Sequence, residues 1–208
     1  MSQKDTRGNS LHDDLVTATS TLLCAPPMEP AADDACMELL TPQNPAETNV
    51  LWVAYSRSPD SCLTQWHRHG AGRPNDLAII NVGDSVRSAA AASTAGENPQ
   101  GPIQTVASAG DLTGLGIKIS EVLTRWADQD AQIVVCFDSL TTLLQYVDPE
   151  KAYEFLHVLT GRLFAADAIA HFHINPGAHD DQTLSMIRSL FDGDVSLTED
   201  GERTVRTR

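Results

Sequence analysis

Lysine and aromatic residues are scarce in this 208-residue sequence. Lysine occurs only three times, at Lys4, Lys118 and Lys151, and Phe, Trp and Tyr together make up 5% of the chain. A broad basic surface for nucleic acid is therefore not expected, because such a surface needs clustered cationic side chains. The hydrophobic fraction of 41% still permits a sizeable core, built mainly from Leu, Val, Ile and Ala.

The sequence also lacks any apolar run near the roughly 20 residues that span a bilayer. Residues 1–14 are polar and lack the apolar centre of a signal peptide, so we expect a cytoplasmic protein with a flexible leader over residues 1–15. No CxxC spacing occurs. The four cysteines are expected to be buried structural thiols rather than ligands or disulfides: Cys24, Cys36, Cys62 and Cys136.

Acidic residues outnumber basic ones, 28 to 14, which gives a net charge of −14. Asp is about twice as frequent as Glu. This lysine-poor, Asp-rich composition favours a halophilic protein, because a Debye length of about 3 Å at 1 M salt weakens self-repulsion. The alternative is ordinary charge for solubility.

From residue 16 onwards, short apolar segments alternate with amphipathic ones. The pattern predicts repeated βαβ units and a mainly parallel sheet in one domain over residues 16–208. Strands are predicted at 19–25, 49–56, 77–82, 103–107, 132–137, 168–174, 195–198 and 203–207, the last two as a C-terminal β-hairpin. Helices are predicted at 31–40, 59–69, 111–127, 148–165 and 180–191, with a helical turn at 139–146 and a loop at 86–102.

The segment 132–140 (Gln-Ile-Val-Val-Cys-Phe-Asp-Ser-Leu) is the most informative stretch. Its continuous apolar run is typical of a strand buried on both faces. Asp138 follows at the carboxyl end, where open α/β sheets bind their ligands. Asp138 has two interpretations: a cation ligand, or the cap of the helical turn that follows, with Ser139 continuing the turn. The cap is the favoured expectation.

Residues 133–140, 141–146, 168–177 and 190–195 resemble the RecA-like ATPase core, in particular its KaiC-like branch. The combination with halophilic composition is similar to haloarchaeal KaiC-like proteins of unassigned function. The resemblance implies a three-layer α/β domain. It also implies that 133–140 is the Walker B strand, with Asp138 and Ser139 as residual nucleotide-binding residues.

The first strand departs from the family pattern. A P-loop needs glycines, a Lys and a Ser or Thr to hold phosphates and magnesium. Residues 25–34 (Ala-Pro-Pro-Met-Glu-Pro-Ala-Ala-Asp-Asp) contain no Gly and no Lys. Glu29, Asp33 and Asp34 place negative charge where a triphosphate would bind. The activating Glu of KaiC-like enzymes is also missing, because the second strand ends Tyr-Ser-Arg-Ser at residues 55–58.

These departures predict a pseudo-ATPase, so neither ATP nor magnesium is an expected cofactor. The resemblance to KaiC-like proteins implies a regulatory or scaffolding protein that acts in signalling through other proteins. It also implies a KaiC-like relative or a second copy of the chain as the expected partner. The alternative is an atypical ATPase that uses Asp138.

A second alternative is a metal-binding protein. His171 and His173 alternate along one strand, so both imidazoles lie on one face. Further ligands would come from beyond the next turn, from His179, Asp180 or Asp181. The opposing interpretation is that the imidazoles only form hydrogen bonds at the end of the sheet.

Overall fold

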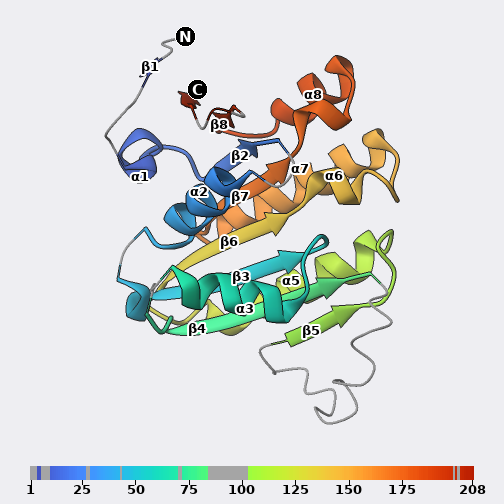
Figure 1. The fold of residues 1–208 in the computed structure, drawn as a ribbon. Coiled ribbons are helices and arrows are strands. Elements are labelled where there is room, and N and C mark those ends of the chain that lie inside the picture. The colour runs from blue at the N-terminus through green and yellow to red at the C-terminus, as the bar shows by residue number, and fades with distance from the viewer. Residues whose placement is uncertain are drawn as a thin grey trace.

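A computed structural model describes residues 4–5, 10–26, 29–42, 44–69, 72–83, 103–198, 200 and 202–208. The predicted loop at 86–102 lies outside these ranges, as do Pro27 and Met28 in the segment after the first strand. Figure 1 shows helices packed on a long twisted sheet. No helix in the described ranges has the length and apolarity needed to cross a membrane.

The predicted elements are present, most with ends within two residues of the expected ones. The strands are β1 (Lys4–Asp5), β2 (Ser20–Cys24), β3 (Thr48–Ala54), β4 (Asp76–Val82), β5 (Ile103–Val106), β6 (Gln132–Asp138), β7 (Ile169–Ile174), β8 (Gly193–Leu197) and β9 (Arg203–Thr207). The helices are α1 (Leu11–Asp14), α2 (Pro30–Leu40), α3 (Pro59–Arg68), α5 (Leu112–Trp126), α6 (Leu140–Leu143), α7 (Pro149–Ala165) and α8 (Asp181–Arg188). Short 3₁₀ turns cover Pro45–Glu47 and Pro176–Ala178.

The nine strands within the described ranges form one sheet, in the order β1-β9-β8-β2-β7-β6-β3-β4-β5. The pairs from β8 through β5 are parallel, whereas β9 pairs antiparallel with both β8 and β1. The mainly parallel sheet and the C-terminal hairpin are thus confirmed. The order also places β7 between β2 and β6, which brings β7 beside the strand that carries Asp138.

Helices cover both faces of the sheet, as the three-layer prediction requires. One hydrophobic core joins the sheet to α1, α2 and α3, through side chains such as Leu11, Leu40 and Trp66. The other joins it to α5, α7 and α8, through side chains such as Leu115, Leu156 and Ile187. The central strands are buried on both faces, so β6 is apolar throughout its middle.

Residues 1–15, predicted as a flexible leader, include two elements. The short strand β1 pairs with β9, and α1 packs its fully buried Leu11 into the core. The Leu11 amide donates to Glu38 on α2. The Ser10 hydroxyl caps α1 by accepting a hydrogen bond from the His12 amide at 3.3 Å.

One local expectation is corrected. The last helix is predicted to reach Phe191 but ends at Arg188, and Phe191 instead fills the core beside Phe172. The helical turn predicted at 139–146 is present as the short helix α6, with Ser139 as its N-cap residue.

Candidate functional site

The site lies at the carboxyl edge of the sheet, where β6 ends beside β3. Ala54 is the register partner of Asp138, and the amides of Tyr55 and Ser56 donate to the Asp138 carbonyl oxygen at 2.6 and 3.1 Å. These bonds hold the exit of β3 against the end of β6. They place the next residue, Arg57, beside the Asp138 carboxylate.

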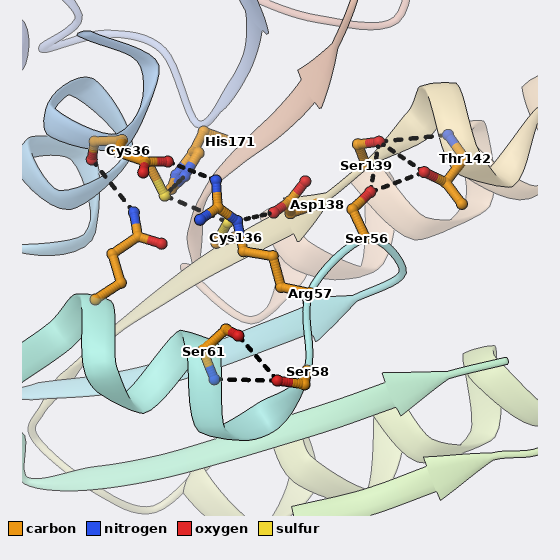
Figure 2. A network of polar contacts seen from close by, with 12 residues as sticks. Cys36, Ser56, Arg57, Ser58, Ser61, Cys136, Asp138, Ser139, Thr142 and His171 are labelled. Carbon is orange, nitrogen blue, oxygen red and sulfur yellow. Dashed lines mark hydrogen bonds and ion pairs between the residues drawn. The ribbon is translucent and has the colours of Figure 1, made fainter. Parts of the chain in front are cut away.

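Arg57 joins two carboxylates from different elements (Figure 2). Its Nε donates to Oδ2 of Asp138 at 2.7 Å, and its terminal guanidinium nitrogen donates to Oδ1 of Asp33, on α2, at 2.5 Å. Burial would lower the pKa of Arg57, but the carboxylates of Asp138 and Asp33 raise it above its ordinary value. The Asp138 side chain is only 8% exposed, so the guanidinium provides its charge compensation.

The N-terminus of α2 is occupied by the chain's own side chain. Glu29 is the N-cap residue, and its carboxylate accepts a hydrogen bond from the Ala31 amide at 3.2 Å. Pro30 at the first helical position has no amide hydrogen to offer. A phosphate at this helix end would meet a carboxylate and fewer free donors, whereas phosphate sites use free amides and the positive end of the helix dipole.

Ser139, not Asp138, caps the turn after β6. The Ser139 hydroxyl accepts from the Thr142 amide at 3.3 Å, so the expectation of an Asp138 cap was wrong. The serine is better placed because Asp138 is still extended in β6 and its carboxylate faces Arg57. The Ser56 hydroxyl completes a small cluster, 3.1 Å from the Ser139 hydroxyl and 2.7 Å from the Thr142 hydroxyl.

A pocket of about 250 Å³ opens beside this hydroxyl cluster. It lies at the carboxyl ends of β3 and β4 and is lined by Tyr55, Ser56, Arg57, Ser58, Asn81, Val82, Gly83, Ala109, Thr142 and Tyr146. Burial, with a smaller contribution from the Asp111 charge, raises the pKa of Tyr55 above its ordinary range, so the phenol stays neutral. The lining combines Arg57 and several hydroxyl-bearing residues with two tyrosines, Tyr55 and Tyr146.

A second group of side chains lies deeper, under the Arg57 bridge. His171 on β7 is the register partner of Cys136 on β6, and Cys36 approaches both from α2 (Figure 2). The two sulfur atoms are 3.6 Å apart, and Nε2 of His171 is 3.3 Å from the Cys36 sulfur. The ring of His173 lies 5.3 Å from that of His171.

Burial and the neighbouring side chains shift the pKa values of this buried group. Burial alone would raise the pKa of Cys36, but the Cys136 thiol and the imidazoles of His171 and His173 lower it well below its usual value. Burial raises the pKa of Cys136 and lowers that of His171. Cys36 is thus the thiol of the group that most readily becomes a thiolate.

The structure brings together only part of the predicted metal site. His171 and His173 share a face of β7 as expected, but the proposed further ligands lie elsewhere. His179 contacts the Thr141 hydroxyl at 3.1 Å, and Asp180 caps α8 through the Thr183 amide. The groups beside the two histidines are instead the thiols of Cys36 and Cys136.

Sequence reasoning missed three of the residues that define this edge: Arg57, Cys36 and Cys136. A signal was present for each thiol. Cys136 precedes Asp138 by two residues on a strand, and Cys36 follows Asp33 by one helical turn, so each shares a face with an acidic residue. No comparable signal in the sequence places Arg57 against Asp138.

Solved structures show the same fold. An uncharacterised protein from Pyrococcus horikoshii, in complex with an unknown peptide, matches with a TM-score of 0.58 and 16% identity, over 92% of this chain and 84% of that one. A KaiC-like protein from Pyrococcus horikoshii OT3 matches with a TM-score of 0.54 and 14% identity, over 91% and 78%. The flagellar accessory protein FlaH from Methanocaldococcus jannaschii matches with a TM-score of 0.50 and 11% identity, over 99% and 86%.

At these identities the likeness shows the fold alone, which is that of KaiC-like and RecA-like archaeal proteins. A search of curated proteins finds no match. A family model does match, over residues 18–197, which span the chain from just before β2 to the end of β8. The chain therefore belongs to a family of unknown function, DUF7504.

Proposed function

We propose that this protein is a KaiC-like pseudo-ATPase of halophilic type, a regulatory or scaffolding protein that acts in signalling through contacts with other proteins. The observation that carries the proposal is the Arg57 bridge. An aspartate in the Walker B position holds magnesium through a free carboxylate. Here the Asp138 carboxylate is paired with a guanidinium, and a magnesium ion at this place would meet a fixed positive charge.

The phosphate side of the site supports the same proposal. The segment after β2 supplies Glu29 and Asp33 in place of glycine and lysine, and Glu29 caps the helix end that would face the phosphates. At an effective dielectric of 20, two like charges 4 Å apart repel by about 4 kcal/mol. Both halves of a magnesium–triphosphate complex would therefore meet charge of their own sign.

A domain of this fold that does not hydrolyse ATP can still bind other proteins. KaiC-like proteins associate edge to edge, and this analogy supports protein binding as the role of the chain. The surface offers apolar side chains for such contacts. Ile117 on α5 and Val158 on α7 are 54% and 56% exposed and line a hollow between these helices. Exposed apolar groups gathered in one place are typical of interaction surfaces.

Two measurements test the proposal. Phosphate release from magnesium-ATP in multimolar potassium chloride should equal the buffer blank, for the wild type and for Asp138→Ala alike. Turnover that disappears in Asp138→Ala would contradict the proposal.

Sedimentation velocity over a range of protein concentrations should show self-association that weakens in Val158→Asp. A wild type that remains monomeric throughout would exclude a second copy as the partner.

One observation favours the alternative of atypical nucleotide binding. The pocket beside Arg57 combines a cation and hydroxyls with the rings of Tyr55 and Tyr146. Its volume of about 250 Å³ lies below the roughly 300–1,000 Å³ of ordinary ligand pockets, so a whole nucleoside triphosphate would not be enclosed. The same turnover assay separates this alternative from the pseudo-ATPase.

A further inference from the structure

Four buried side chains from three elements converge beneath the Arg57 bridge. They are Cys36 on α2, Cys136 on β6, and His171 and His173 on β7. Each offers one metal-ligating atom, and these four atoms all lie within 4.8 Å of one another. Two thiols and two imidazoles are a ligand set that proteins use for tetrahedral zinc.

The fold explains why residues so far apart in the sequence meet here. β7 is inserted between β2 and β6, which makes His171 the neighbour of Cys136 on the same face of the sheet. His173 lies two residues further along β7 and therefore also faces α2. Cys36 projects from α2, which packs on β6, and completes the group from above.

The distances suit a zinc ion. With zinc–sulfur bonds of about 2.3 Å and zinc–nitrogen bonds of about 2.0–2.1 Å, neighbouring ligand atoms of a tetrahedron are about 3.3–3.8 Å apart. The two sulfur atoms are 3.6 Å apart, and His171 Nε2 lies 3.3 Å from the Cys36 sulfur. No two of the four ligand atoms are more than 4.8 Å apart. The most widely separated pair would therefore have to approach by at most roughly 1 Å to bind a central zinc ion.

An unpaired nitrogen points to a ligand independently of these distances. Nε2 of His173 is buried, in a residue that is 9% exposed, and has no hydrogen-bond partner among the residues that the structure describes. Buried polar atoms without partners are uncommon, because burial removes their bonds to water. A metal ion bound to one ring nitrogen of His173 would leave only the other nitrogen in need of a hydrogen-bond partner.

We propose that Cys36, Cys136, His171 and His173 form a structural zinc site that fixes α2 to the centre of the sheet. Binding replaces the two thiol protons by zinc–sulfur bonds and releases both protons, with no change of oxidation state. All four positions of the tetrahedron are filled by protein atoms and the group is buried, so no position remains for a catalytic water. Soft sulfur ligands also disfavour magnesium and calcium, which bind oxygen.

The site would set the position of α2, the helix that carries Asp33. Asp33 lies one turn before Cys36, so the zinc site and the Arg57 bridge hold the same helix at successive turns. The zinc site is independent of the loss of nucleotide binding, because zinc would anchor α2 equally in an active or an inactive domain.

Metal analysis of the full chain tests the proposal. The protein is produced with zinc in the medium, purified under a phosphine reductant and passed over a chelating resin. We expect about one zinc per chain by mass spectrometry of the elements. The Cys36→Ser and Cys136→Ser variants should retain less than about a fifth of that amount. Cys24→Ser and Cys62→Ser are matched controls, because both thiols are buried but lie outside the group, and they should retain it all.

Cobalt provides a readout that does not require stable variants. Cobalt(II) added to metal-free wild type should give the intense visible bands of a tetrahedral site together with thiolate-to-metal charge transfer. Zinc should raise the midpoint of thermal unfolding of the metal-free protein by roughly 10 °C. Wild-type protein with no stoichiometric zinc and no such spectrum would overturn the proposal. Equal metal retention in Cys36→Ser and Cys62→Ser would also overturn it, as would a Cys36–Cys136 disulfide that persists under reductant.

Discussion

Arg57 and Asp138 form an ion pair at the carboxyl edge of the sheet, with Nε of the arginine 2.7 Å from Oδ2 of the aspartate. The pair joins the end of β3 to the end of β6, and the second contact of Arg57, with Asp33, extends it to α2. The sequence alone favours Asp138 as a helix cap, and the family resemblance implies a residual nucleotide-binding acid. In the structure its carboxylate is instead one partner in an ion pair with Arg57.

Removal of Arg57 should destabilise the domain. Arg57→Ala leaves the Asp138 carboxylate, 8% exposed, without its partner. Arg57 itself is about one-third exposed, so solvent reduces the effect to about 1–2 kcal/mol in the free energy of unfolding. Urea denaturation monitored by circular dichroism measures it. Arg73→Ala, at an exposed surface position, is the control and should change stability by less than about 0.5 kcal/mol.

The bridge also predicts coupling between its two ends. Asp138→Asn alone removes a charge that Arg57 neutralises, and should be destabilising. In the Arg57→Ala background the same change removes an uncompensated buried charge and should be neutral or stabilising. A double-mutant cycle by urea denaturation gives the coupling free energy, which we expect to be about 1 kcal/mol or more. Additive effects of the two changes would show that the pair contributes little.

His69 should give the protein a small pH-dependent stability. The Gln65 carbonyl oxygen and the Asp34 carboxylate raise the pKa of His69 above its ordinary value of 6.5. Because the folded pKa exceeds the unfolded one, the stabilisation is complete below the unfolded pKa and is lost as pH rises through the folded pKa.

The corresponding comparison is His69→Gln against wild type at about pH 5.5 and pH 8.5. The variant should be less stable than wild type at the lower pH and similar to it at the higher. The Asp34→Asn change should reduce the wild-type pH dependence, since it removes one of the two groups that favour the imidazolium. An equal difference at both pH values would count against this assignment.

Two glycines should respond to alanine in opposite directions. A Cβ at Gly193, in β8, would lie 2.8 Å from both Leu15 Cδ2 and Thr21 Oγ1, so the neighbours must move. We expect Gly193→Ala to cost about 1–2 kcal/mol. Gly161 lies in α7, where an added methyl group would meet no atom within 4 Å, and Gly161→Ala should stabilise the protein by about 0.5–1 kcal/mol. Thermal unfolding of both variants and of wild type measures the two changes in stability, which should have opposite signs.

The sequence predicts the layers and most elements because their signals are local. The apolar run at 133–137 marks a strand buried on both faces, and the acid after it marks the sheet edge. The two-residue spacing of His171 and His173 is also a local signal, because it places both side chains on one face of β7. The C-terminal end of α8 and the cap of α6 are harder to predict, because tertiary contacts decide them. Phe191 packs against Phe172 instead of extending α8, and the Asp138 carboxylate binds Arg57 instead of capping α6.

The convergence of Cys36, Cys136 and His171 was beyond local reasoning. Cys36 and Cys136 are 100 residues apart, and no spacing rule connects them. They meet because β7 lies between β2 and β6 and because α2 packs on that face, which are properties of the whole sheet. The Arg57 bridge has the same origin, since it depends on the pairing of β3 with β6.

We propose that the carboxylate of Asp138 and the N-terminus of α2 do not hold magnesium-ATP. Isothermal titration calorimetry of magnesium-ATP into the reduced full-length protein, in multimolar potassium chloride, tests it most directly. We predict no binding heat above dilution up to millimolar nucleotide, for wild type and Asp138→Ala alike. Micromolar binding by the wild type that disappears in Asp138→Ala would contradict the account.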